Sequence, residues 1–467
     1  MPSSSAETTP RSEAPPPPRR AEALWGGPKL AFAAILALAA TLRVVGVAYA
    51  HPFALFSPDE QSIVPRAWHM AHGGGLDPHW FDYPTLLMYV IAPFEAWESH
   101  PSYLAARVVV IVLAVGSVAA SWWLGSRAYG GAAGAVAAAA VAVETTHVAY
   151  SRMAVTDVPL TLAVAVALAL MVSGRIELAG LAAGLAMGFK YPGVFLLVPL
   201  VVAGWRQWRR VAIGFVAAAA AFCATSPYFV VHLSSAVGDV LRVQRIARQG
   251  WLGFEHDHVA PIAFLDRLWD GLGPAFLVCV LGLGVALARR RRNDLILASF
   301  VIVYFLDLCT LGAHFDRYVL PLVPVLGALA GRFRALAPVT LLLLVVPLTW
   351  SIRDDKRLTR TDTRIAAARW IDAHVPKGAE IAAESSTAVP GGYTVVPIPL
   401  PLPGRDAEVD VGHAGWILVS GAVADRVLAA RDVYPRRAAF YARLPKPAFR
   451  LDPHDGTSGP WVAVCRP

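Results

Sequence analysis

Two adjacent carboxylates, Asp59 and Glu60, stand a few residues after the first long apolar segment of the chain. A carboxylate at a membrane boundary can act as a general base toward an acceptor hydroxyl, provided that it lies within hydrogen-bond reach. The alternative is a solvated acidic turn that Pro58 initiates, and the local sequence favours neither interpretation. The same polar stretch contains further residues that we expect to line a substrate cavity, namely Arg66, Asp82 and Tyr83.

A third carboxylate, Asp157, falls at the junction between two later apolar segments. It would occupy the first turn of the following helix, where the helix dipole favours a negative charge, so capping is its structural explanation. We also consider a catalytic role for Asp157, beside the first pair of carboxylates. Arg152, shortly before it, is a candidate partner for Asp157 or a phosphate-binding cation, and its structural alternative is an anchor at the membrane interface.

Two cations, Lys190 and Arg317, also interrupt apolar sequence. Ionisable residues at membrane depth are costly and often functional, and an ammonium at that depth can meet a lipid phosphate. Arg317 offers a planar fork of donors that suits phosphate oxygens. The structural alternatives are a lysine that snorkels to the interface and an ion pair of Arg317 with Asp316 or Asp307. The neighbours that we assign to the same site are Tyr318, for the phosphate, and His314, for the cavity.

The sequence leaves a metal site open. The polar connections contain histidines close to carboxylates, and neutral imidazoles together with carboxylates can bind zinc or manganese. Their spacing matches no metal motif, and interfacial histidines are the more ordinary interpretation. No cofactor is therefore certain, while a divalent metal stays open. The residues concerned are His69, His72, His79, Glu255, His256, Asp257 and His258.

The elements that must position these residues are membrane helices. Of the 467 residues, 56% are hydrophobic and only 16% are charged, which departs from the composition of an ordinary soluble domain. Blocks such as Leu30 to Tyr49 and Leu272 to Ala288 are long enough to cross about 30 Å of hydrocarbon. Because a lipid-exposed backbone must satisfy its own hydrogen bonds, we predict a mainly α, polytopic helix bundle that is integral to the plasma membrane.

The net charge of +8 does not indicate a nucleic-acid partner, because the basic residues cluster in short runs between apolar blocks. This placement is typical of cytoplasmic loops. The four cysteines form neither a disulfide framework nor a zinc-binding spacing, and no phosphate-binding loop or dinucleotide fingerprint supports a soluble nucleotide substrate. The basic runs are Arg19-Arg20, Arg206 with Arg209-Arg210, and Arg289 to Arg292.

The apolar segments predict about eleven membrane crossings. An odd number places the two termini on opposite sides, with the N-terminus in the cytoplasm, and each arginine-rich connection then falls on the cytoplasmic side. The segment from Tyr83 to Trp97 is short and contains prolines, so we expect it to lie in the interface. The long outer connections are then 50–102 and 231–270. The expected spans are 29–49, 103–124, 131–148, 158–173, 177–190, 192–204, 211–230, 271–288, 294–312, 318–331 and 336–350.

Composition also predicts three regions. The Ser-, Pro- and Ala-rich stretch 1–27 cannot bury a core and is expected to be a disordered cytoplasmic tail. Residues 28–350 are expected to form the membrane domain. The composition then becomes that of a soluble protein, and a helical pattern at 363–374 followed by strand-like runs predicts a small extracytoplasmic α/β domain over 351–467. The strand-like runs are Glu380 to Glu384, Tyr393 to Val396 and Gly415 to Ser420.

Taken in order, the polar motifs within 29–331 resemble those of the GT-C superfamily of transferases that use polyprenyl-phosphate sugars. The similarity is to the branch that contains dolichyl-phosphate-mannose protein mannosyltransferases and the bacterial lipid A aminoarabinose transferase. One motif departs from the family pattern, because Pro84-Thr85 stands where two prolines are common and no basic residue precedes Pro84. The motifs are Asp59-Glu60, Asp82 to Leu87, Arg107, Tyr150 to Arg152, Asp157 to Pro159, Gly188 to Tyr191 and Arg317 to Pro321.

This resemblance implies a GT-C fold and the transfer of a sugar from a polyprenyl-phosphate donor to a hydroxyl of a protein, lipid or glycan at the outer membrane face. It implies Asp59 as the general base, with Glu60 beside it and Asp157 as a helper at the same cavity. It also implies that Lys190 and Arg317 hold the carrier phosphate. Such a reaction needs a base for the hydroxyl and cations for the developing phosphate charge. A single carboxylate base predicts inversion at the anomeric carbon.

Two other classes stay open on the sequence. A transporter or flippase for lipid-linked saccharides would share the hydrophobicity and the membrane-depth charges, although no pair of Gly- or Pro-broken helices repeats in two halves. A polymerase or ligase for lipid-linked glycans is nearer in chemistry, but nothing in it requires Asp59 and Glu60 at their position. The sequence does not determine the sugar, the acceptor or the oligomeric state.

Overall fold

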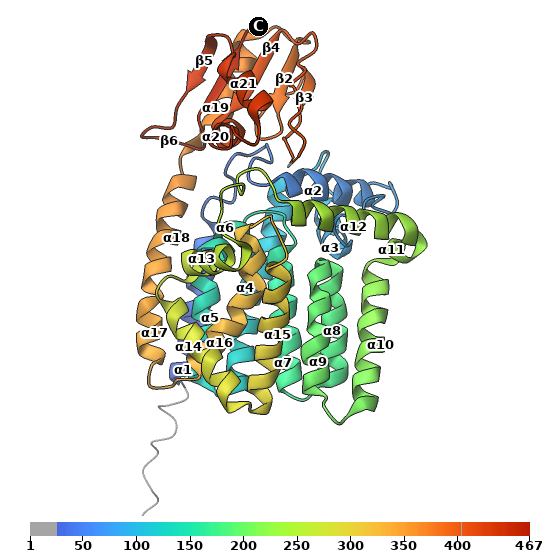
Figure 1. Cartoon of the computed structure of the whole chain (residues 1–467), viewed down its shortest axis with the longest axis vertical. Helices are drawn as coiled ribbons and strands as arrows, with labels where there is room; N and C mark the ends of the chain where they lie inside the picture. Colours follow the sequence, from blue (N-terminus) through green and yellow to red (C-terminus); the bar gives the residue numbers. More distant parts are fainter. Residues whose placement is uncertain (1–25, 403) are drawn as a thin grey trace, which may run out of the picture.

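The computed structural model describes residues 26–402 and 404–467. It contains a bundle of helices, a layer of shorter helices across one end of the bundle, and a small sheet beyond that layer (Figure 1). The tail expected over 1–27 lies outside the described residues, apart from its last two. The chain is therefore mainly helical, as predicted, with a small sheet-containing unit at its C-terminus.

Every apolar segment that we expected to cross the membrane is helical. Three helical segments, Tyr103–Tyr129, Trp208–Thr225 and Ala337–Leu358, are long and apolar enough by themselves to cross a membrane. The larger number of crossings therefore stays a prediction. The bundle contains α1 Gly26–Val44, α4 Tyr103–Tyr129, α5 Gly131–Val143, α7 Asp157–Val172, α8 Ile176–Phe189, the 3₁₀ helix η2 Tyr191–Leu196 with α9 Leu197–Ala203, α10 Trp208–Thr225, α14 Ala275–Arg289, α15 Arg292–Leu308, the 3₁₀ helix η3 Asp316–Leu322 with α16 Val323–Gly331, α17 Ala337–Leu343 and α18 Val345–Leu358.

Local sequence signals delimit and pack these helices. α4 begins after Ser102, whose hydroxyl accepts a hydrogen bond from the backbone N–H of Ala105. It ends at Gly130, whose φ of 97° is the left-handed conformation that favours glycine. Gly180 of α8 packs directly on the backbone of Gly214 in α10, where any side chain would collide with a carbonyl group. Small residues of this kind let membrane helices approach closely and form a firm scaffold.

Both long connections contain helices. Figure 1 shows α2, α3, α11 and α12 in a layer between the bundle and the sheet. The segment expected to lie in the interface contains α3, whose ten residues are too few for a helix that spans about 30 Å of hydrocarbon. The helices of the outer connections and of the α5–α7 junction are α2 Pro58–Ala71, α3 Leu86–Glu95, α6 Thr145–Tyr150, α11 Pro227–Val231, α12 Leu233–Gln249 and α13 Ala260–Leu272.

The C-terminal sheet unit, residues 361–467, follows α18. Its five-stranded sheet has the order β3-β2-β4-β7-β5, in which β2 is parallel to β3 and β4, and β7 is antiparallel to β4 and β5. The helix predicted over 363–374 is α19, and the three predicted strands correspond to β2, β3 and β4. The elements are β1 Thr361–Asp362, α19 Thr363–His374, β2 Glu380–Glu384, β3 Thr394–Ile398, β4 Trp416–Ser420, α20 Gly421–Ala429, α21 Pro435–Ala442, β5 Pro447–Leu451, β6 Thr457–Ser458 and β7 Val462–Cys465.

A buried carboxyl makes the stability of the sheet unit depend on pH. Burial raises the pKa of Glu384 to about 7, although hydrogen bonds from Tyr441 and Ser420 act to lower it. Because the ordinary pKa is 4.5, the folded unit binds this proton more tightly than the unfolded chain does. The resulting stabilisation is complete below about pH 4.5 and is lost as the pH rises through about 7.

We therefore expect amide protection in β2 and β4 to weaken between about pH 5 and pH 8, and Glu384→Gln to remove most of this pH dependence because glutamine does not titrate. Hydrogen–deuterium exchange of the full chain, corrected for the intrinsic rate, measures both effects. Glu380→Gln, at the exposed start of the same strand, is the control. An unchanged pH dependence in Glu384→Gln would contradict the assignment.

Candidate active site

A cavity of about 610 Å³ lies where the bundle, the outer helices and the sheet unit meet. The membrane part lines it with the start of α2, the segment before α3, the end of α6 and the start of η3. The outer helix α12 and the sheet unit supply the other walls. Residues of the cavity that the following argument uses are Asp59, Asp82, Tyr83, Tyr150, Arg242, Arg317, Tyr318, Arg364, Ser385, Ser386 and Arg426.

Asp59 lies in the first turn of α2 and faces this cavity. Ser57 is the N-cap residue of that helix, and its hydroxyl accepts a hydrogen bond from the backbone N–H of Asp59. Oδ2 of Asp59 accepts hydrogen bonds from Nη1 of Arg317 at 2.7 Å and from the hydroxyl of Tyr83 at 3.2 Å. Oδ1 has no hydrogen-bond partner among the residues that the structure describes. One oxygen of the carboxylate is therefore held while the other stays available.

Asp157 connects the two cations. It begins α7 and is almost fully buried, and its Oδ1 accepts a hydrogen bond of 2.5 Å from Nζ of Lys190. Its Oδ2 lies 3.7 Å from Nε of Arg317, and neither of these two atoms has a hydrogen-bond partner within the described chain. Asp157 therefore acts both as a helix-terminal carboxylate and as the counter-charge of Lys190.

Aromatic rings surround the two cations. Nζ of Lys190 lies 4.7 Å from the ring centroid of Tyr318 and 5.8 Å from that of Tyr83. The guanidinium of Arg317 lies 5.7 Å from the ring centroid of Tyr150. The faces of aromatic rings attract cations, and their bulk keeps water away. The site thus combines two carboxylates and two cations in a low-dielectric setting, where a bound anion would interact strongly with the cations.

Glu60, expected beside Asp59 at the site, points elsewhere. Its carboxylate accepts two hydrogen bonds of 2.8 Å from the guanidinium of Arg107 and one of 3.0 Å from the backbone N–H of Ala154. Both side chains of the ion pair are at most 1% exposed. The structure thus corrects this expectation: Glu60 fastens α2 to α4 and does not reach the cavity.

Arg152 is also separate from the cluster. Its guanidinium pairs with Asp355 of α18 at 2.7 Å and donates to the carbonyl of Val45 at 2.7 Å. Of the alternatives weighed for Arg152, the pairing with Asp157 is therefore wrong, and Arg152 does not line the cavity. The cause is the course of the chain, which turns between α6 and α7 and so directs Arg152 toward α18.

The remaining expected residues divide between the cavity and its surroundings. Asp82 lines the cavity and pairs with Arg242 of α12. Arg66 stacks on the ring of Trp80 at 4.4 Å and does not line the cavity. His314 does not line the cavity. Its ring contacts Asp257 at 3.3 Å and the carbonyl of Leu311 at 3.1 Å.

Several cavity residues were not expected from the sequence. Tyr150 belongs to a motif that the sequence singled out, but its ring had no assigned role. Arg242, Arg364 and Arg426 come from α12, α19 and α20, and no motif marks them. For Arg242, the sole sequence signal that could have indicated a place at the cavity is an amphipathic helix at 233–249. No sequence signal indicates such a place for the arginines of the sheet unit.

One group of potential metal ligands occurs in the described part of the chain. Asp77, His79 and His232 bring their ligand atoms within 4.8 Å of one another, and Nε2 of His232 lies 2.7 Å from Asp77. Two imidazoles and a carboxylate suit zinc or a similar divalent ion. None of the three lines the cavity, so the group is separate from the charged cluster. Of the histidines weighed earlier, His79 belongs to it.

The model of glycosyltransferase family 87 matches residues 80–311. This range includes Asp82, Asp157 and Lys190 and ends shortly before Arg317. No curated protein matches the chain.

Two solved structures have a related fold, and a third matches less closely. The apo oligosaccharyltransferase of Archaeoglobus fulgidus matches with a TM-score of 0.59 and 12% identity, over 93% of this chain and 74% of that one. AglB of the same organism, in complex with an inhibitory peptide and a dolichol-phosphate, matches with a TM-score of 0.53 and 14% identity, over 76% and 59%. ArnT from Cupriavidus metallidurans, in the apo state, matches with a TM-score of 0.49 and 20% identity, over 66% of this chain and 60% of its own length. At such identities, the similarity is one of fold.

The buried charges predict a large effect of neutralising Asp157. Asp157→Asn leaves Lys190 and Arg317 with too little negative charge around them, and breaking a buried pair costs about 3–5 kcal/mol. Thermal unfolding of the purified protein in lipid nanodiscs should show a clearly lowered midpoint, and adding Lys190→Met should restore part of it. Glu177→Gln, which breaks a solvent-exposed pair with Arg210, is the control and should leave the midpoint nearly unchanged. Equal midpoints for the two single variants would contradict the analysis.

Proposed function

We propose that this chain, a glycosyltransferase of the GT-C superfamily, moves a sugar from a polyprenyl-phosphate carrier to a hydroxyl of an acceptor at the outer face of the membrane. The observation that carries the proposal is one chain of ion pairs, Lys190–Asp157–Arg317–Asp59, whose members Asp59 and Arg317 line the cavity. Bound dolichol-phosphate and peptide in the structure of AglB support the same two partners here. The acceptor class, whether protein, lipid or glycan, stays open.

Asp59 is the proposed general base. Its free Oδ1 can take the proton of an acceptor hydroxyl as the hydroxyl oxygen attacks the anomeric carbon. The bond between that carbon and the phosphate oxygen breaks, and its electron pair stays on the carrier phosphate. Because this step uses one carboxylate as a base and forms no covalent intermediate, we expect direct displacement with inversion of configuration.

Lys190 and Arg317 are the proposed phosphate ligands. Both side chains are nearly buried, and Asp157 lies between them and contacts each. Arg317 lines the cavity, so its guanidinium can donate to a phosphate oxygen there. Cations prepositioned in this way stabilise the charge that develops on the leaving phosphate. Tyr318 would flank the phosphate by its contact with Lys190.

Charge placement supports the proposed orientation. The charged cluster lies where α8 ends and η3 begins, whereas the run Arg289 to Arg292 joins α14 and α15 at the far end of α15. Arginine-rich connections are typical of the cytoplasmic side. We therefore propose that the membrane domain, 28–350, presents the cavity on the outer side, with the C-terminal region, 351–467, outside beside it.

The first test of this function is Asp59→Asn. Asparagine keeps the shape of the side chain but cannot accept the proton, so sugar transfer should fall by about 10²-fold or more. The assay follows release of polyprenyl phosphate from a panel of undecaprenyl-phosphate monosaccharides by the protein in nanodiscs, with binding of undecaprenyl phosphate measured in parallel. Asp372→Asn, on the surface of the sheet unit, serves as the control. Full activity of Asp59→Asn would remove Asp59 from the mechanism, and movement of intact donor without cleavage would indicate a transporter.

The second test concerns the phosphate. A charge-assisted hydrogen bond contributes about 1.5–3 kcal/mol, so Lys190→Ala and Arg317→Ala should each weaken binding of undecaprenyl phosphate by about 10- to 100-fold. Arg267→Ala is a matched control, because Arg267 pairs with Asp257 outside the cavity. Affinities equal to that of the wild type in both cation variants would place the phosphate elsewhere.

A further inference from the structure

The segment that precedes Asp59 has little regular structure. Residues 45–57, between α1 and α2, form turns and bends, so hydrogen bonds within a helix or strand do not fix their course. Three buried guanidiniums bind their carbonyl groups instead. Arg152 donates to Val45 at 2.7 Å, Arg107 to Tyr49 at 3.0 Å, and Arg364 to Leu55 at 3.2 Å.

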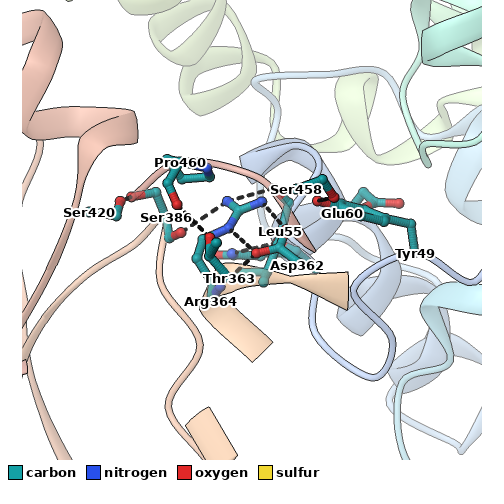
Figure 2. Close-up of polar contacts among 12 residues, drawn as sticks. Tyr49, Leu55, Glu60, Asp362, Thr363, Arg364, Ser386, Ser420, Ser458 and Pro460 are labelled. Carbon is teal, nitrogen blue, oxygen red and sulfur yellow. Dashed lines mark hydrogen bonds and ion pairs between the residues drawn. The ribbon is translucent and has the colours of Figure 1, made fainter. Parts of the chain in front are cut away.

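Arg364 differs from the other two because it belongs to the sheet unit. It lies in the first turn of α19 and is 7% exposed. Asp362 binds it through two hydrogen bonds, of 3.0 Å to Nε and 2.6 Å to Nη2. Nη1 then donates to Leu55 and, at 3.1 Å, to the carbonyl of Ser386 (Figure 2). The guanidinium therefore bridges the loop before α2 and the turn after β2.

Two weaker contacts run parallel to this bridge. The side-chain amide of Gln61, in α2, donates to the carbonyls of Ala54 at 3.1 Å and Ser385 at 3.4 Å. The hydroxyls of Tyr49 and Ser458 lie 2.9 Å apart, and both residues appear in Figure 2. The loop before α2 and the first turns of α2 are thus joined to the sheet unit by three separate contacts.

This attachment bears on one member of the charged cluster. Asp157 and Lys190 lie at the ends of bundle helices, and Arg317 begins η3, whereas Asp59 stands only four residues after Leu55. The position of its carboxylate depends on where α2 starts. A general base displaced by about 1 Å can cost about 10²-fold in rate.

We infer that Arg364 is a positioning residue, through which the sheet unit holds the loop before α2 so that Asp59 faces the transferring sugar. This inference rests on the proposed function. The sheet unit then acts as part of the active site, and a membrane domain without it would bind donor but transfer slowly. Arg364 and Leu55 both line the cavity that Asp59 lines.

The kinetic test uses Arg364→Lys, which keeps the charge opposite Asp362 but cannot donate to Leu55, Ser386 and both carboxylate oxygens at once. With an undecaprenyl-phosphate monosaccharide that the wild type cleaves, kcat should fall by about 10-fold or more while KM for the donor changes by less than about 2-fold, because Lys190 and Arg317 still hold the phosphate. Arg369→Lys, exposed in the same helix, should match the wild type. An unchanged kcat would overturn the inference.

A second measurement does not depend on the reaction. Hydrogen–deuterium exchange of Arg364→Lys without substrate should show faster exchange of amides in 53–62, with α19 and β2 as protected as in the wild type. Unchanged exchange in 53–62 would overturn the inference. A wild-type protein that transfers no sugar would instead refute the proposed function, and the exchange result would still be interpretable.

A milder variant separates positioning from folding. Tyr49→Phe removes only the hydroxyl that contacts Ser458, so the sheet unit keeps its core. It should lower kcat by a few-fold with an unchanged thermal midpoint, and combining it with Ser458→Ala should add nothing, because both changes break one contact. Faster exchange throughout the sheet unit of Arg364→Lys, together with wild-type kcat in Tyr49→Phe, would show that these contacts serve stability alone.

Discussion

Arg317 lies between two carboxylates. The need to neutralise its buried charge constrains how the elements around it pack. Its guanidinium lies 2.7 Å from Asp59 and 3.7 Å from Asp157, and Asp157 also neutralises Lys190. A buried charge without a counter-charge is costly, so the start of α2, the start of α7, the end of α8 and η3 must meet at one place. The helices of the bundle reach that place because small residues let them pack closely, as Gly180 does against Gly214.

Other buried charges in the chain form ion pairs that are fully satisfied within the protein. Glu60 with Arg107, and Arg152 with Asp355, are equally hidden from solvent, but they satisfy each other and nearby backbone groups. The cluster at the cavity differs because Asp59 and Arg317 line a space large enough for a ligand, and Oδ1 of Asp59 has no hydrogen-bond partner in the described part of the chain. Burial of charge alone therefore does not identify the site, whereas burial together with free hydrogen-bonding capacity at a cavity does.

Much of the site was predictable because charges at the ends of apolar segments are forced to one level. The segments that carry Asp157, Lys190 and Arg317 end at the same side of the bundle, so these residues share a layer before any packing is known. The same logic failed for neighbours in sequence. Successive residues of an α-helix point about 100° apart, so Glu60 turns toward α4 while Asp59 faces the cavity. Arg152 lies in the turn between α6 and α7, and the course of that turn directs it toward α18.

The sequence by itself determined the apolar helices, the helix and strands of the C-terminal region, and the presence of acids and cations at one membrane level, because these depend on local periodicity and segment length. Only the tertiary structure decided which charges meet, that Arg152 belongs to Asp355, and that Arg364 reaches Leu55. Such pairings join residues that are far apart in the chain, and their geometry is set by the packing of whole helices, which local sequence does not encode.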